Sequence, residues 1–132
     1  IKSTKKKFEQ AMDDDLNMPV RIKVMPIVRE KDGLAMSSRN VYLSPQERMS
    51  AVVLHRSLKL AKELCRKGER DPKKVIKKIH SLIMKEKDAK IDYISIVNFD
   101  KLENVEKIYG KVLVALGVWI GKTRLIDNVI LG

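Results

Sequence analysis

Apolar positions in the middle of the chain recur at helical spacing and predict two helices. Residues 44–47 (Ser-Pro-Gln-Glu) have the pattern of a capping box, with proline at the first helical position. The apolar stripe that follows continues to about Lys67, and Gly68 is expected to end the helix. Asp71-Pro72 begins a second amphipathic pattern that runs to about Lys85. Because the connection between the two is short, we expect an antiparallel helix pair.

Other parts of the chain carry strand patterns. Residues 20–24 alternate between apolar and basic types, and residues 34–37 are expected to pair with them as a hairpin. Residues 91–97 are rich in β-branched types, and residues 112–120 are apolar on both faces, which predicts a central strand. Residues 125–131 form either a third strand or an extended tail. These patterns predict an α+β fold: a small, largely antiparallel sheet with the helix pair packed on one side.

The first residues of the chain carry the weakest pattern. Residues 1–15 match an amphipathic helix at best, with Phe8 and Met12 one turn apart. Residues 13–15 are three aspartates, which raises the question of a metal site. Because consecutive carboxylates point in different directions on a helix, a solvated charge run is the favoured interpretation.

Composition narrows the class of protein. The chain has 132 residues, enough for one domain with a modest core. Its net charge of +11 favours polyanionic partners such as nucleic acids, nucleotides or acidic membrane surfaces. Acidic residues are interspersed with the basic ones, and the aromatic content of 5% provides few stacking platforms for a single strand. Most of the charge is therefore interpreted as solvated surface.

Membrane and redox signals are weak. No apolar run reaches the length of a membrane span, and residues 1–15 lack the apolar core of a signal peptide. Cys65 is the single cysteine, so an internal disulfide is impossible. A cytoplasmic location without membrane contact is the expectation.

Residues 33–43 (Gly-Leu-Ala-Met-Ser-Ser-Arg-Asn-Val-Tyr-Leu) carry the most informative chemistry. Glycine allows the backbone to approach a ligand closely. Ser37 and Ser38 are able to donate hydrogen bonds to phosphate oxygens, and Arg39 is able to clamp them with its guanidinium. On residue types alone, a polyphosphate-gripping loop and an ordinary polar loop remain open.

Other candidate motifs are less persuasive. Residues 121–123 (Gly-Lys-Thr) lack the earlier glycine of a phosphate-binding loop and are better interpreted as a tight turn. His55 and His80 have no ligand partner at metal-binding spacing, and no histidine lies near Ser37 or Ser38 in sequence. Arg29, Glu30 and Asp32 form either a charged hairpin or a set in which an acid holds Arg29 or Arg39.

From Leu16 onward the chain resembles the C-terminal domain of pantothenate synthetases, the pantoate–β-alanine ligases. The most specific match is residues 33–40, and the closing match at residues 121–128 supports it independently. The matching segments follow the family's order and spacing: residues 16–20, 26–30, 32–43, 68–71, 91–97 and 121–128.

The resemblance implies an ATP-dependent ligase and a role for this part of it. The family uses ATP and Mg²⁺ to form pantoyl adenylate, from which the amine of β-alanine displaces AMP. Its N-terminal Rossmann-like domain binds pantoate and β-alanine, and its C-terminal domain acts as a lid in this nucleotidylyltransferase-like enzyme. Carried onto this chain, the ATP-binding residues are Val28, Met36, Ser37, Ser38 and Arg39. The resemblance places Val28 near the adenine and turns the two serine hydroxyls and Arg39 toward the phosphates.

The chain also departs from the family pattern. The family's His-containing signature has no counterpart, so no catalytic or metal-binding residue is assigned. A Gln-Lys-Asp motif and following glutamines are expected where Ile1, Lys2 and Lys5 stand. We therefore interpret residues 1–15 as a leader or residual linker helix and residues 16–132 as the lid domain.

An isolated lid is expected to be monomeric, to lack ligase activity and to bind ATP weakly, whereas the full-length family is expected to be homodimeric. The alternatives are a small basic nucleic-acid-binding module, which the composition and the absence of a recognisable motif disfavour, and a pure interaction domain.

Overall fold

The structure, a computed structural model, describes residues 28–132. Predictions for residues 1–15, the aspartates at 13–15 and the strand at 20–24 lie outside this range. The elements are a short 3₁₀ helix and three α-helices followed by three strands: η1 (Ser38–Tyr42), α2 (Pro45–Ala51), α3 (Val53–Arg66), α4 (Pro72–Ile83), β1 (Ala89–Asn98), β2 (Val112–Ile120) and β3 (Thr123–Leu131).

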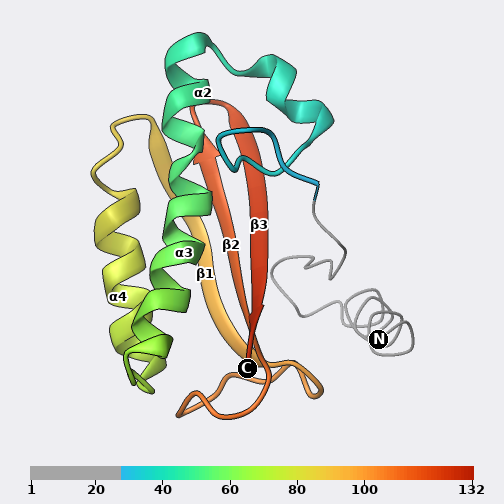
Figure 1. Ribbon diagram of the computed structural model, residues 1–132. Coiled ribbons are helices and arrows are strands. Elements are labelled where there is room, and N and C mark those ends of the chain that lie inside the picture. The colour runs from blue at the N-terminus through green and yellow to red at the C-terminus, as the bar shows by residue number, and fades with distance from the viewer. Residues whose placement is uncertain (1–27) are drawn as a thin grey trace.

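The three strands form an antiparallel sheet in the order β1-β2-β3, and α3 and α4 lie together on one side of it (Figure 1). The α+β prediction is confirmed. Residues 125–131 belong to a paired strand rather than to an extended tail. Two-residue hairpin geometry joins Ile120 to Thr123, and Gly121 adopts a φ of +60°, so the tight turn predicted there is also confirmed.

Local signals placed the helix ends correctly. Ser44 and Glu47 form the reciprocal capping box, and the Asp71 side chain caps α4. The single helix predicted from residue 44 to 67 is wrong in one respect, because the structure divides it at Val52. Val52 and Val53 are adjacent β-branched residues, which have a lower helix propensity than their neighbours.

The core lies between the sheet and the helix pair. Alternate β2 residues such as Val114, Leu116 and Val118 face the helices, where they meet Leu58 and Ile79. Leu113 and Ala115 pack on the opposite face with Val97 and Phe99. Burial on both faces confirms β2 as the central strand. Within residues 28–132, no helix is both long enough and apolar enough to span a bilayer.

Candidate functional site

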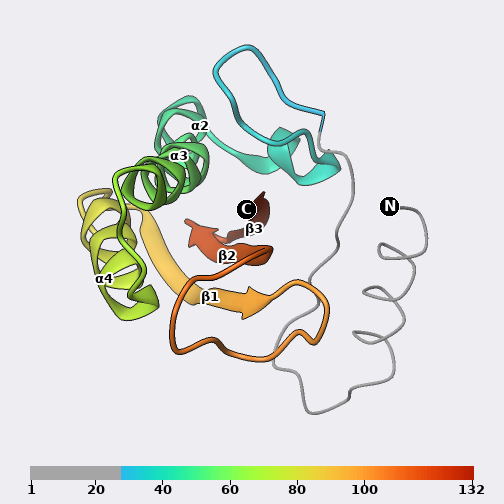
Figure 2. The same cartoon turned by 60° about the horizontal axis from the view of Figure 1, so that its bottom comes forward.

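Residues 28–43, hereafter the site segment, lie beside α2 and the outer edge of β3 (Figure 2). The chain reverses at Gly33, where the Glu30 amide donates to the Leu34 carbonyl and the Met36 amide donates to the Val28 carbonyl, both at 2.8 Å. A strand was predicted at 34–37, but in the described range the pairing is a single antiparallel bridge between Arg29 and Ala35. Ladder formation stops there because the chain turns into η1 after Ser37.

The candidate ATP-binding residues all lie on the surface. Val28 and Met36 are 66% and 58% exposed. Ser37, Ser38 and Arg39 are exposed as well, at the start of η1. Ser37 is extended, and its hydroxyl oxygen accepts a hydrogen bond from the Arg39 amide at 3.1 Å. The expected loop is therefore a capped helical turn, which holds the two serines and the arginine on adjacent positions of one short element.

Arg39 reaches a groove that is built by distant parts of the chain. Its Nη1 donates to the Arg124 carbonyl at 3.2 Å. The open groove has a volume of about 550 Å³ and is lined by Arg39, Tyr42, Trp119, Lys122, Thr123 and Arg124. Val28, Met36, Ser37 and Ser38 are not among the lining residues. Three cationic side chains and two aromatic rings thus surround a surface hollow beside the serines.

The turn between β2 and β3 supplies the groove residues that sequence reasoning did not assign to a site. Arg124 donates a hydrogen bond to the Asp92 carboxylate at 2.9 Å. Its guanidinium carbon also lies 5.8 Å from the centroid of the Tyr93 ring. Trp119 carried no local signal, and Lys122 was considered only as part of a phosphate-binding loop that its spacing excludes. Both residues reach the groove through the pairing of β2 with β3.

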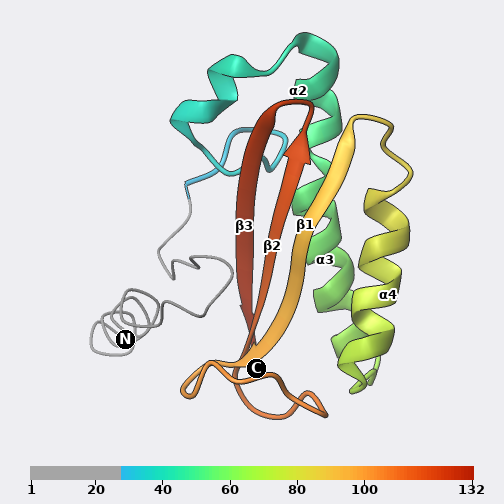
Figure 3. The same ribbon diagram turned by 180° about the vertical axis from the view of Figure 1, so that it is seen from behind.

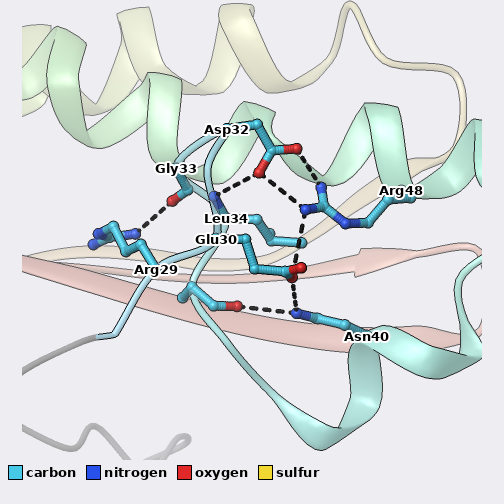
Figure 4. Close-up of polar contacts among 8 residues, drawn as sticks. Arg29, Glu30, Asp32, Gly33, Leu34, Asn40 and Arg48 are labelled. Atoms are coloured by element: carbon cyan, nitrogen blue, oxygen red, sulfur yellow. Dashed lines mark hydrogen bonds and ion pairs between the residues drawn. The ribbon is translucent and has the colours of Figure 1, made fainter.

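Glu30 and Asp32, the acids near the turn at Gly33, pair with Arg48 and not with Arg29 or Arg39. Asp32 accepts two hydrogen bonds from Arg48 at 2.7 and 2.9 Å, and Glu30 lies 3.4 Å from Arg48 (Figure 4). The hydrogen bonds from Arg48 hold the pKa of the Asp32 carboxyl below its usual value. Glu30 also accepts a hydrogen bond from the Asn40 amide at 2.9 Å, which ties η1 to the turn.

Arg29 instead pairs with Asp127, which lies 98 positions later on β3. Its two terminal nitrogens donate to the two carboxylate oxygens at 2.7 and 2.9 Å. The Nη1 of Arg29 also donates to the Gly33 carbonyl at 3.0 Å (Figure 4). The bidentate pair therefore joins the start of the site segment to the sheet.

Gly33 lies directly against His55 of α3. Its φ is +94°, and a Cβ atom added there would stand 2.1 Å from the imidazole. Burial, followed by the charge of Arg29, lowers the pKa of His55. His55 is half-buried at the edge of the core, whereas His80 is exposed. In the range 28–132, no group of three His, Cys, Asp or Glu side chains is arranged to hold a metal ion.

The lowered pKa of His55 predicts that acid weakens the fold. The unfolded state takes up a proton first as the pH falls below about 6.5, so this contribution to stability is fully present above that pH. It is lost as the pH falls through the lower pKa of the folded state. Urea unfolding between about pH 5 and pH 8 should show a slope in the free energy that His55→Gln reduces and the matched His80→Gln retains. An equal slope in His55→Gln would contradict this assignment.

Comparison with known proteins adds independent information. The family model for pantoate-beta-alanine ligase matches residues 7–130 of the chain.

This chain belongs to the pantoate-beta-alanine ligase family.

Curated relatives of the pantoate-beta-alanine ligase family share long stretches with the chain. Pantothenate synthetase from Acetivibrio thermocellus is 64% identical over 119 residues, which cover 90% of this chain and 42% of that protein. The enzyme from Caldicellulosiruptor saccharolyticus is 59% identical with the same coverage of 90% and 42%. The crystal structure of pantothenate synthetase from Thermus thermophilus matches with a TM-score of 0.75 at 33% identity, over 91% of this chain and 43% of that chain. The chain thus spans about two fifths of the length of these ligases.

Proposed function

We propose that residues 16–132 form the lid of a pantothenate synthetase, which closes over ATP and holds its phosphates. The observation that carries this proposal is the placement of Arg39, Ser37 and Ser38 at the exposed start of η1, beside a groove that also presents Lys122 and Arg124. Membership of the pantoate-beta-alanine ligase family supports it.

The reaction explains why such a group of donors is useful. A carboxylate and an amine do not condense spontaneously in water, so a ligase must first activate the carboxylate. In the proposed reaction the carboxylate oxygen of pantoate attacks the α-phosphorus of ATP, and pyrophosphate leaves with the bond electrons. The amine of β-alanine then attacks the acyl carbon and AMP departs. Negative charge builds on the phosphate oxygens in the first step, so fixed donors and cations aimed at them lower its barrier.

The described contacts leave Arg39 and Ser37 able to act on phosphate. Among residues 28–132, the Arg39 guanidinium donates to the Arg124 carbonyl alone, which leaves several of its five N–H groups for a ligand. The Ser37 oxygen accepts from the Arg39 amide, so its hydroxyl proton stays available to donate. Val28 and Met36 offer exposed apolar surface, and the proposal places Val28 against the adenine.

The remaining parts of the activity belong to the whole enzyme. Because the chain spans 42% of the relative's length, we assign the binding of pantoate and β-alanine to the rest of the protein. The described residues contain no cluster suited to a metal, so the proposal gives them no direct part in holding Mg²⁺. Closure of the lid excludes water from the reactive adenylate.

The test joins residues 16–132 to the N-terminal part of the Acetivibrio thermocellus relative, which is 64% identical where the two overlap. We expect this hybrid enzyme to form pantothenate from pantoate, β-alanine and ATP, and the 132-residue chain alone to form none. The relative rebuilt from its own two parts is the control for the junction. Turnover by the chain alone would overturn the proposal, as would a folded hybrid with no activity beside an active control.

A further inference from the structure

Asp127 is a buried carboxylate with apolar neighbours on both sides of its row. It lies on β3 between Leu125 and Val129, opposite Leu116 of β2, on the face that packs against the helices. Its side chain is 1% exposed. It accepts three hydrogen bonds: two from Arg29 and one from the Asn128 amide at 2.8 Å. The Asp127 carboxylate is therefore well hydrogen-bonded, and its main partner is Arg29 of the site segment.

Stability alone does not explain a charged pair at this place. Two charges lose hydration when they are buried, and well-packed apolar residues of similar size are often equally stable or more stable there. A bidentate arginine–carboxylate pair, however, has one narrow range of geometry, which apolar contacts do not impose. The buried Asp127 carboxylate therefore fixes the point on β3 at which the Arg29 side chain binds.

The point at which Arg29 binds β3 also determines where the following residues of the site segment lie. Arg29 donates both to Asp127 and to the Gly33 carbonyl, so one guanidinium joins the sheet to the turn. The turn is closed by the Glu30–Leu34 and Met36–Val28 backbone hydrogen bonds, and Ser37 follows at once. Arg39 then meets β3 again at the Arg124 carbonyl. The two attachment points, Arg124 and Asp127, lie three positions apart on the strand, which corresponds to roughly 10 Å.

We propose that the Arg29–Asp127 pair is a positioning latch, which sets where Arg39 and the two serines stand relative to the groove. The nucleotide part of this inference rests on the proposed function, whereas the structural part does not. Arg29 and Asp127 are positioning residues, because they act through the segment and do not touch the phosphates. Views from opposite sides place η1 and α2 at the same end of the sheet as the β2–β3 turn (Figures 1 and 3). Asp127 lies at the middle of β3, opposite Leu116.

A second ion pair holds the same segment and is expected to matter less. Arg48 of α2 bonds Asp32, whose side chain is 45% exposed. Exposed pairs contribute little because water competes for both partners. Loss of the Arg48 contact should therefore leave the position of η1 largely unchanged.

The test uses three variants of the 132-residue chain and two measurements, with Arg39→Ala as a fourth variant for ATP binding alone. Arg29→Met/Asp127→Leu removes both charges without leaving one unpaired, Arg29→Lys keeps the charge but loses the fork, and Arg66→Met removes an unrelated exposed pair with Glu63. Hydrogen exchange follows the hydrogen-bonded amides of Glu30, Gly33, Met36 and Asn40 against those of β2. Fluorescence of Trp119, the single tryptophan, follows titration with ATP from within the groove.

In the double variant we expect an unchanged or higher melting temperature. Hydrogen exchange in the site segment should be faster by roughly 5- to 100-fold, and ATP binding should be weaker by a similar factor. Exchange in β2 should stay as in the parent chain. Arg29→Lys should fall between the parent and the double variant, and Arg66→Met should match the parent in both measurements.

Parent-like exchange in the site segment of Arg29→Lys and of the double variant would overturn the latch. Unfolding of the double variant leaves Arg29→Lys as the deciding variant, because it retains an ion pair. If exchange accelerates while Arg39→Ala leaves ATP binding unchanged, the latch stands and the proposed function fails.

Discussion

Replacement of Arg39 by alanine is expected to lower kcat/KM of the hybrid enzyme for ATP by roughly 100- to 1,000-fold, the usual effect of losing one fixed donor to developing charge. Arg39 is exposed at the groove, and its fork is suited to two phosphate oxygens at once. Because the charge on the phosphates grows toward the transition state, kcat should fall more than KM rises. Steady-state release of pyrophosphate measures both constants.

One further variant separates charge from geometry at position 39, and a second variant elsewhere on the surface serves as a control. Arg39→Lys keeps the positive charge but not the planar fork, so its kcat/KM should lie between those of the parent and of Arg39→Ala. Arg66→Ala is the matched control, since Arg66 is an exposed arginine that pairs with Glu63 near the far end of α3. Activity of Arg39→Ala within about twofold of the Arg66→Ala control would be incompatible with a phosphate-binding role for Arg39.

Substitution of Gly33 by alanine is expected to destabilise the protein by roughly 2–5 kcal/mol. The left-handed backbone at φ +94° is unfavourable for any residue with a Cβ atom. The added methyl group would also stand 2.1 Å from His55, so the imidazole or the turn must move. Urea unfolding followed by circular dichroism gives the change in free energy.

Gly68 offers a control for the backbone contribution. Its φ is +105°, yet nothing lies within 4 Å of an added Cβ atom. Gly68→Ala should therefore cost only the conformational part, about 1–2 kcal/mol. The difference between the two variants measures the collision with His55, and His55→Ala should recover much of that difference in the Gly33→Ala background. Equal losses at Gly33 and Gly68 would show that the contact with His55 has no energetic weight.

Much of the fold follows from patterns that are read locally. The capping box at Ser44, the cap at Asp71 and the glycine turn at Gly121 each concern residues within a few positions, and all three are present. The apolar run of β2 predicted a central strand because both faces need covering. The break at Val52 was missed, because the lower helix propensity of two adjacent valines is a weak signal within a continuous helical pattern.

The candidate site was likewise predicted from the sequence only in part. Its serines and arginine were recognised from their residue types, which carry the chemistry of phosphate binding whatever the fold, although their role in binding ATP is still a prediction. The groove was not foreseeable, because it forms where η1 meets the turn between β2 and β3. Glu30 and Asp32 were considered as local partners of Arg29 or Arg39 because they lie close in the sequence. In the structure both acids pair with Arg48.

The amino-acid sequence by itself determined the class of fold, the helix caps at Ser44 and Asp71, the central strand and the candidate phosphate-binding side chains, because periodicity, capping and residue chemistry act over short distances. Tertiary structure alone decided that Asp127 receives Arg29, that His55 lies under Gly33, and that Trp119, Lys122 and Arg124 surround Arg39. Those contacts join residues far apart along the chain. They arise from strand register and from the packing of the helices on the sheet, which no short segment specifies.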